Sequence, residues 1–248
     1  MKNLSLLLLA GSALLLASCN MNSVPQPEAV SGQVKELSPT ASGAVTYTGW
    51  SGGAGKVMAS VEGKDNLVTA DLAADGKFSL TLPRLDASLL SPMDLSSELP
   101  DGCTGSLKTS GAGDARGNAA SFDVQAGKSG MIAPAAFQMS NSSINISSGS
   151  YVYVDKAVGL SGKINCTEEG VGVTGDINLQ LRAGWNKVTF TISATDQGGN
   201  ISLTTGSVPA QWVYLEGGLA FPIRQQSLSG SALAQPALKV ARTLPFFR

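Results

Sequence analysis

The side chains that most often carry out acid–base and nucleophilic chemistry are scarce in this sequence, and histidine is absent. A Ser-His-Asp or Cys-His arrangement therefore cannot be assembled. Most catalytic zinc sites, which use imidazole ligands, are excluded for the same reason. A serine–lysine dyad would need a Ser-x-x-Lys stretch at the start of a helix, and the chain has none there. We expect a protein that is not an enzyme and that uses no cofactor.

Three further stretches have the outward form of ligand-binding motifs. Gly52-Gly-Ala-Gly-Lys56 is glycine-rich, but a phosphate-binding P-loop needs glycine where Trp50 stands and Ser or Thr where Val57 stands. We interpret it as a flexible loop. Glu168-Glu169 and Asp196–Asn200 contain oxygen ligands that suit calcium. Solvated loops are the simpler interpretation of both, and we predict no metal site.

Aromatic side chains are the remaining candidates for ligand recognition. Trp50 and Trp185 are possible contacts for a small ligand or a carbohydrate, because an indole ring offers a flat apolar face. Trp185 stands in Arg182-Ala-Gly-Trp-Asn186, a predicted hairpin turn, and we expect it to be the more exposed of the two. The alternative is that both rings are buried in a β core.

The first residues have the order of a secretory signal. Lys2 supplies one positive charge, and Leu4 to Leu16 form a mainly apolar run of 13 residues. A membrane-spanning helix needs about 20 such residues. The order of charge, apolar run and small residues therefore predicts a cleaved signal over residues 1–18.

The end of this segment, Leu16-Ala17-Ser18-Cys19, resembles the lipobox of bacterial lipoproteins. The resemblance implies that Cys19 receives a diacylglycerol, that the chain is cut before it, and that the new amine is acylated, for example with palmitate. Two or three acyl chains give stable anchoring, at about 0.8 kcal/mol for each buried methylene. An ordinary signal followed by a chance cysteine is the alternative.

This resemblance also implies a location. The protein would be a membrane-anchored lipoprotein of the cell envelope, facing the periplasm or the cell surface. Asn20 follows the cysteine instead of the Asp that resembles an inner-membrane retention signal, so the outer membrane is favoured if the cell is Gram-negative. The partner this predicts is membrane lipid, through the acylated Cys19.

Charge and composition limit the other partners. The chain has 17 basic and 18 acidic residues, and loss of Lys2 with the signal leaves 16 and 18, a net charge of −2. The basic residues are scattered singly, so we expect no nucleic-acid binding. Asn-x-Ser/Thr occurs at Asn141, Asn145, Asn165 and Asn200. In a Ser/Thr-rich bacterial chain we attribute this pattern to chance.

Two cysteines remain beyond Cys19. Cys103 and Cys166 are expected to form a disulfide in an oxidising compartment, closing a loop of 63 residues. In the chain-entropy model such a bond stabilises the fold by about 4 kcal/mol. The alternative is a pair of buried free thiols.

Short alternating runs separated by turn residues predict an all-β protein. Asp75-Gly76 is a hairpin signal between Ala70–Leu72 and the alternating Phe78–Leu82. Residues 127–149 are rich in Gly, Ser and Ala and only weakly patterned. The remaining expected strands are Val45–Tyr47, Val57–Val61, Leu67–Leu72, Ser106–Ser110, Ala119–Val124, Tyr151–Val154, Leu160–Cys166, Asp176–Leu181, Lys187–Ser193, Ile201–Thr205 and Gln211–Leu215.

Residues 31–83 carry a second resemblance. Ser31–Val34, Val57–Val61 and Ala73–Pro83 together resemble the carboxypeptidase-regulatory or transthyretin-like β-sandwich module, chiefly in the Asp-Gly-x-Phe-Ser-Leu-x-Leu-Pro stretch. The resemblance implies a small sandwich with no catalytic residues of its own. The glycine-rich residues Gly49–Gly55 depart from the family pattern.

We therefore predict one or two β-sandwich lobes, immunoglobulin- or transthyretin-like, with a short helical connector in which Ser91-Pro92 fits the start of a helical turn. The expected parts are a signal (1–18), a lipidated tether (19–29), a first lobe (30–83), the connector (84–105), a second lobe (106–223) and a C-terminal strand or tail (224–248). The expected function is that of a non-catalytic structural or interaction module in the envelope, whose partners are other envelope proteins or glycans. The alternative is a lipoprotein that binds a small ligand or a carbohydrate.

Overall fold

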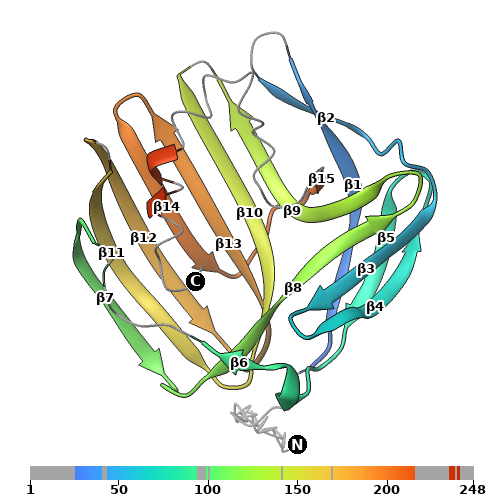
Figure 1. The fold of residues 1–248 in the computed structure, drawn as a ribbon, viewed down its shortest axis with the longest axis horizontal. Coiled ribbons are helices and arrows are strands. Elements are labelled where there is room, and N and C mark those ends of the chain that lie inside the picture. Colours follow the sequence, from blue (N-terminus) through green and yellow to red (C-terminus); the bar gives the residue numbers. More distant parts are fainter. Residues whose placement is uncertain are drawn as a thin grey trace, which may run out of the picture.

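The computed structural model describes residues 26–40, 44–93, 99, 101–140, 142–168, 170–215, 235–237 and 239–240. The signal, Cys19 and most of the tether lie outside these residues. The described part forms fifteen strands, which confirms the all-β prediction (Figure 1). They are β1 Glu28–Pro39, β2 Val45–Gly49, β3 Gly55–Val61, β4 Lys64–Leu72, β5 Lys77–Leu82, β6 Ser91–Pro92, β7 Cys103–Gly111, β8 Arg116–Gln125, β9 Ser129–Met139, β10 Ser143–Val154, β11 Val158–Glu168, β12 Val171–Leu181, β13 Gly184–Thr195, β14 Gly198–Thr205 and β15 Trp212–Leu215.

The strands belong to one mixed, sandwich-like sheet with two parts. In the first part, β8, β3, β4, β5, β1, β15 and β9 are paired in that order, and β9 pairs again with β8, so the circuit closes. The second part is an open, curved row of β10, β13, β14, β12, β11 and β7. Pairing of β10 with both β8 and β9 joins the parts. Strands of both expected lobes therefore share one hydrogen-bonded network, since β8 pairs with β3.

Trp212 on β15 lies at the centre of the first part. Its indole contacts Phe78 and Phe122 edge-on, at ring-centre distances of 5.0 and 4.9 Å, and stacks on Tyr151 at 6.3 Å. Gly32 on β1 makes room for it, because a Cβ there would lie 2.1 Å from the Trp212 ring. The parallel pairing of β15 with β1 therefore depends on the space that Gly32 leaves for the buried indole.

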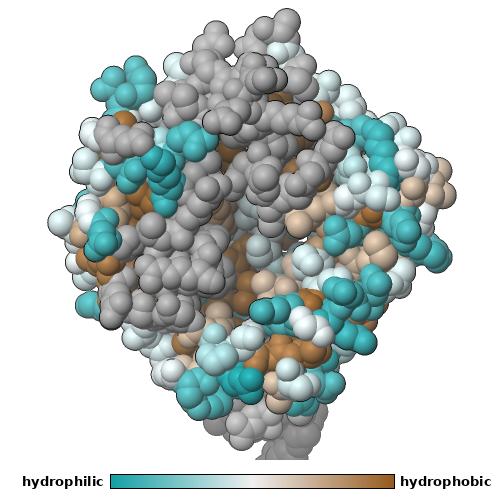
Figure 2. Space-filling view, in the orientation of Figure 1, coloured by the Kyte–Doolittle hydropathy of each residue, from teal (hydrophilic) through white to brown (hydrophobic). Residues whose placement is uncertain are grey.

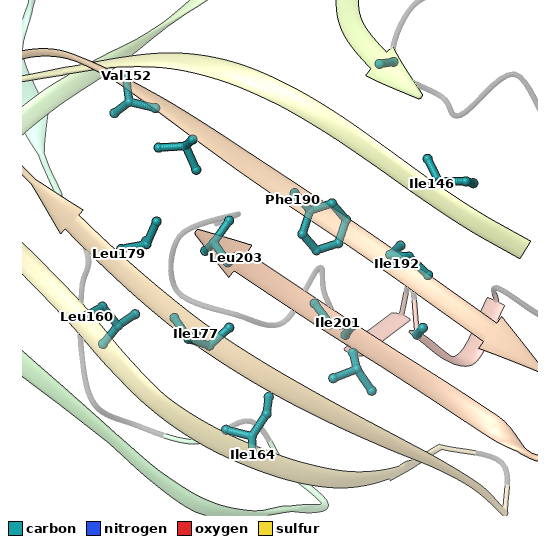
Figure 3. Packing of buried hydrophobic residues seen from close by; sticks show 14 of the residues in the cluster. Ile146, Val152, Leu160, Ile164, Ile177, Leu179, Phe190, Ile192, Ile201 and Leu203 are labelled. Carbon is teal, nitrogen blue, oxygen red and sulfur yellow. The ribbon is translucent and has the colours of Figure 1, made fainter. Parts of the chain in front are cut away.

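The second part buries one face of its curved sheet. Buried and exposed residues alternate strictly along β12, as expected for strands with one apolar face. Figure 3 shows the buried face, where aliphatic side chains of neighbouring strands meet around Phe190. Helical residues 235–237 and 239–240, which we call the helical turn, belong to the same cluster through Ala237 and Val240. No described helix is long and apolar enough to cross a membrane.

The predicted disulfide is present. Cys103 on β7 and Cys166 on β11 are register partners and are bonded to each other. The bond joins the edge strand β7 to its neighbour at the end where β11 turns into β12.

The expected helical start at Ser91-Pro92 is wrong. These two residues form β6 and pair with Gly117 and Arg116 of β8, and the only helical element described between residues 84 and 93 is a 3-10 turn at Ala87–Leu89. Asn118 donates to the carbonyl of Leu89 at 2.6 Å, and Arg116 donates to that of Leu90. These side-chain hydrogen bonds hold the segment extended along β8. They are tertiary contacts, which a local helix-capping pattern in the sequence does not reveal.

The hairpin predicted between Asp176–Leu181 and Lys187–Ser193 is also wrong. Although β12 and β13 are consecutive, β14 lies between them, parallel to β12 and antiparallel to β13. The pairing of β14 ends at Thr205. The segment that links β12 to β13 can therefore pass beyond that end of β14. The weakly patterned residues 127–149 contain all of β9 and the first part of β10, both central strands.

The carboxylate of Glu36 joins three segments of the first part. It accepts hydrogen bonds from the backbone N–H and the hydroxyl of Ser51, both at 2.8 Å, and from Lys128 Nζ at 2.7 Å. Burial acts to raise the pKa of Glu36, but the hydrogen bonds from Lys128 and Ser51 outweigh burial and hold the pKa below its ordinary value of 4.5. The ionised form is therefore the one that stabilises the fold.

We expect removal of the disulfide by Cys103→Ser with Cys166→Ser to lower the free energy of unfolding by about 4 kcal/mol, because the unfolded chain regains the freedom of a long loop. Guanidinium unfolding of the double variant and of the oxidised wild type measures the difference. Equal midpoints would contradict a stabilising role, and reduced wild type should match the double variant.

We expect Glu36→Gln to destabilise the protein by about 1 kcal/mol at pH 7, because three donors lose a charged acceptor. A carboxyl with a lowered pKa stabilises the fold above its unfolded pKa, and this contribution is lost as the pH falls through the folded value. The difference from wild type should therefore shrink below pH 4.5. Unfolding curves between pH 7 and about pH 3 measure it, and a difference that stays constant would contradict it.

Candidate ligand-binding sites

Trp50 is a core residue in the structure. Its indole N–H donates to the carbonyl of Gly53 at 2.7 Å, and its ring meets that of Tyr214 edge-on at 5.4 Å. Only 6% of Trp50 is exposed. The glycine-rich loop is thus folded against its own tryptophan, and Lys56, its last residue, pairs with Asp71 at 2.6 Å. This placement matches the buried alternative for Trp50.

Trp185 is half-buried and lies in β13, not in a turn. Its indole N–H donates to the carbonyl of Pro83 at 2.8 Å, across 102 residues of sequence. Its ring contacts Tyr153 edge-on at 5.4 Å. Trp185 therefore fastens the segment after β5 to β13. Trp50 and Trp185 contact different partners among the described residues.

A hollow of 490 Å³ lies beside Trp185, and we call it the Trp185 hollow. Lys187 forms an ion pair with Glu28 there at 2.8 Å and lies 5.8 Å from the centre of the Tyr151 ring. The hydrogen bond to Glu28 raises the pKa of Lys187. The side chain of Asn186 is hydrogen-bonded to the backbone of the segment that links β12 to β13. Among the described residues its lining is Glu28, Gln180, Arg182, Trp185, Asn186, Lys187, Thr205 and Gly206.

A larger hollow of 980 Å³ lies at the opposite end of β12, β13 and β14, and we call it the hairpin-end hollow. It lies where β9 turns into β10, β11 into β12 and β13 into β14. Apolar Ile144, Val173 and Ala194 contribute to it. The rest of its described lining is glycine, hydroxyl, amide and sulfur side chains, and none of it is charged. Such a lining suits a neutral ligand.

Seven uncharged polar residues lie side by side across the outer face of the sheet at this end. Adjacent members are register partners on adjacent strands. Asn200 Nδ2 donates to Thr174 Oγ1 at 2.9 Å. All are exposed except the half-buried Ser193. We call this set the neutral row; in spatial order it is Gln138, Asn145, Ser193, Asn200, Thr174, Asn165 and Thr104.

The neutral row was missed by sequence reasoning, although a signal for it was present. Asn145, Asn165 and Asn200 are three of the four Asn-x-Ser/Thr positions beyond the predicted signal. Residues two apart on a strand share a face, so this spacing marks polar side chains on the exposed face. The fourth position, Asn141, lies outside the described residues.

The acidic residues considered as calcium ligands do not form a cluster among the described residues. Glu168 pairs with Lys239 of the helical turn at 3.3 Å, and Glu169 lies outside the described residues. The described residues contain no group of three or more Asp, Glu, Cys or His that could hold a metal ion.

Asp123 has a pKa raised by burial. On the face seen in Figure 2, hydrophilic residues lie in separate groups and not in one continuous patch.

No protein-family model matches this chain, and neither do the curated proteins or the solved structures searched. The resemblances to a lipobox and to the transthyretin-like module stay predictions.

We expect Trp185→Phe to lower the free energy of unfolding by about 1 kcal/mol, because the carbonyl of Pro83 loses its donor while most of the ring contact is kept. Trp50→Phe is the matched control, since it removes an indole bond that is local to one loop. Hydrogen exchange next to Pro83 should increase in the Trp185 variant alone. Unchanged exchange there would contradict the fastening role.

Proposed function

We propose that this protein is a non-catalytic lipoprotein of the cell envelope, acting as an interaction module held on the membrane by acylated Cys19. The observation that carries the proposal is the arrangement of the two ends of the molecule. Glu28, the first residue of β1, is paired with Lys187 near the start of β13. Ser193 and Thr195, near the end of β13, line the hairpin-end hollow.

Distances along the chain support this orientation. Nine residue steps separate Cys19 from Glu28, so an acylated Cys19 lies within about 30 Å of Glu28. Lys187 and Ser193 are six residues apart on one strand, or about 20 Å. The tether would thus join the body at the Trp185 hollow, and the hairpin-end hollow lies at the far end of β13 from this point of attachment. A rigid β body between anchor and hollow suits a spacer and binding module.

The uncharged lining of the hairpin-end hollow supports binding over catalysis. General acid–base chemistry requires a titratable side chain within hydrogen-bond reach of the reacting group, and the described lining contains no acid, lysine, arginine or tyrosine.

The Trp185 hollow favours a second candidate function, the binding of a small ligand or a carbohydrate. It combines an indole edge, amides and the cation of Arg182, a mixture common in sites for polar ligands. Quenching of tryptophan fluorescence by a ligand in wild type, lost in Trp185→Phe, would support it.

The membrane part of the proposal is tested with Cys19→Ala. We expect the variant to lose membrane retention on fractionation and to keep the wild-type unfolding midpoint, because β1 begins only at Glu28. Unchanged retention after washing with salt and carbonate would show that the attachment lies elsewhere.

The interaction part is tested with a photo-crosslinking amino acid placed at Gln197 in the hairpin-end hollow. Gln180, an exposed glutamine in the Trp185 hollow, is the matched control. We expect adducts with other envelope components from position 197 and few from position 180. Adducts only from position 180, or none from either, would contradict the proposal.

A further inference from the structure

We propose that the neutral row and the hairpin-end hollow bind an extended, uncharged polysaccharide; this inference rests on the proposed role as an envelope interaction module and names its ligand. The two features coincide. Six of the seven members of the neutral row, all but Thr104, also line the hollow. The site is therefore a strip of hydroxyl and amide groups with a depression along it.

The chemistry of the strip matches a sugar polymer. A carboxamide contributes both donors and an acceptor, and a hydroxyl contributes one donor and two acceptor lone pairs. A polysaccharide hydroxyl needs both kinds of partner. Exposed Asn and Gln side chains in the neutral row are available for this, apart from the bond from Asn200 to Thr174.

The neutrality of the strip is local. One strand step below it, on the same outer face, Lys163 and Asp176 form an ion pair at 3.5 Å. Lys163 and Asp176 are two residues from Asn165 and Thr174 along β11 and β12. Charged residues are thus tolerated on this face and begin beside the neutral row. Its uncharged surface matches an uncharged ligand, and an acidic or basic polymer would gain no ion pair from it.

The spacing of the strip favours a repeating ligand. Neighbouring strands lie about 4.8 Å apart, so the seven members extend over about 29 Å. One strand spacing is close to the length of one sugar unit in an extended chain. Each contact adds little net affinity in water, so binding must come from several units held at once. A single sugar should bind weakly, and affinity should rise with chain length.

The test uses purified full-length protein in detergent and three series of neutral linear oligosaccharides, made of β-linked glucose, β-linked N-acetylglucosamine or α-linked glucose. Titration calorimetry should show binding to at least one series, with an affinity that rises up to about six units, the number of strand spacings in the neutral row.

Asn200→Lys and Asn165→Lys should weaken the binding roughly tenfold. Asn178→Lys is the matched control, because Asn178 is an exposed asparagine on the same face of β12, outside the neutral row. It should change affinity less than about twofold. Equal unfolding midpoints show that all three variants fold.

Absence of binding to all three series, affinity independent of chain length, or equal weakening by Asn178→Lys would each overturn the inference. Failure here is distinct from failure of the proposed function. Crosslinking from position 197 to a protein, with no binding of oligosaccharides, would keep the interaction module and reject a polysaccharide as its ligand.

Discussion

The burial of Trp212 is the contact on which the rest of the architecture depends. Its strand, β15, pairs with β1 on one side and with β9 on the other, so it closes the circuit of the first part. The ring fills the space left by the missing side chain of Gly32 and contacts Phe78, Phe122 and Tyr151. Segments from both ends of the described chain are thereby tied to one indole.

This closure gives the molecule two ends with different chemistry. Tyr151 stacks on Trp212 and lies on β10, which continues into the curved second part. The two parts are therefore connected by a continuous strand. The hydrogen bond from Trp185 to the carbonyl of Pro83 is a further contact between them. The tether side carries an ion pair and the indole edge, while the hairpin side carries the uncharged strip. Rigid separation of an anchor from a binding surface is the physical basis of the proposed role.

Strand prediction succeeded where alternation was strong and failed where side chains were small. Phe78–Leu82 and the turn at Asp75-Gly76 were predicted because a buried face leaves a period of two. β9 and much of β10 were missed because Ala, Gly and Ser have little contrast in hydropathy, although Ala133 and Ala135 are buried in the core. Trp185 was placed in a turn because its flanking strands were assumed to pair, and the insertion of β14 depends on residues far along the chain.

The amino-acid sequence by itself determined the all-β class, the pairing of Cys103 with Cys166 and the absence of imidazole chemistry, because these follow from local periodicity, from residue counts and from redox chemistry. Tertiary structure alone decided which strands are neighbours. Asn145, Asn165 and Asn200 are scattered over 56 residues of sequence, and only the order β10, β13, β14, β12, β11 brings them into one row. The physical reason is that cross-strand register is set by the packing of the opposite, buried face, where Ile146, Ile192 and Ile201 meet.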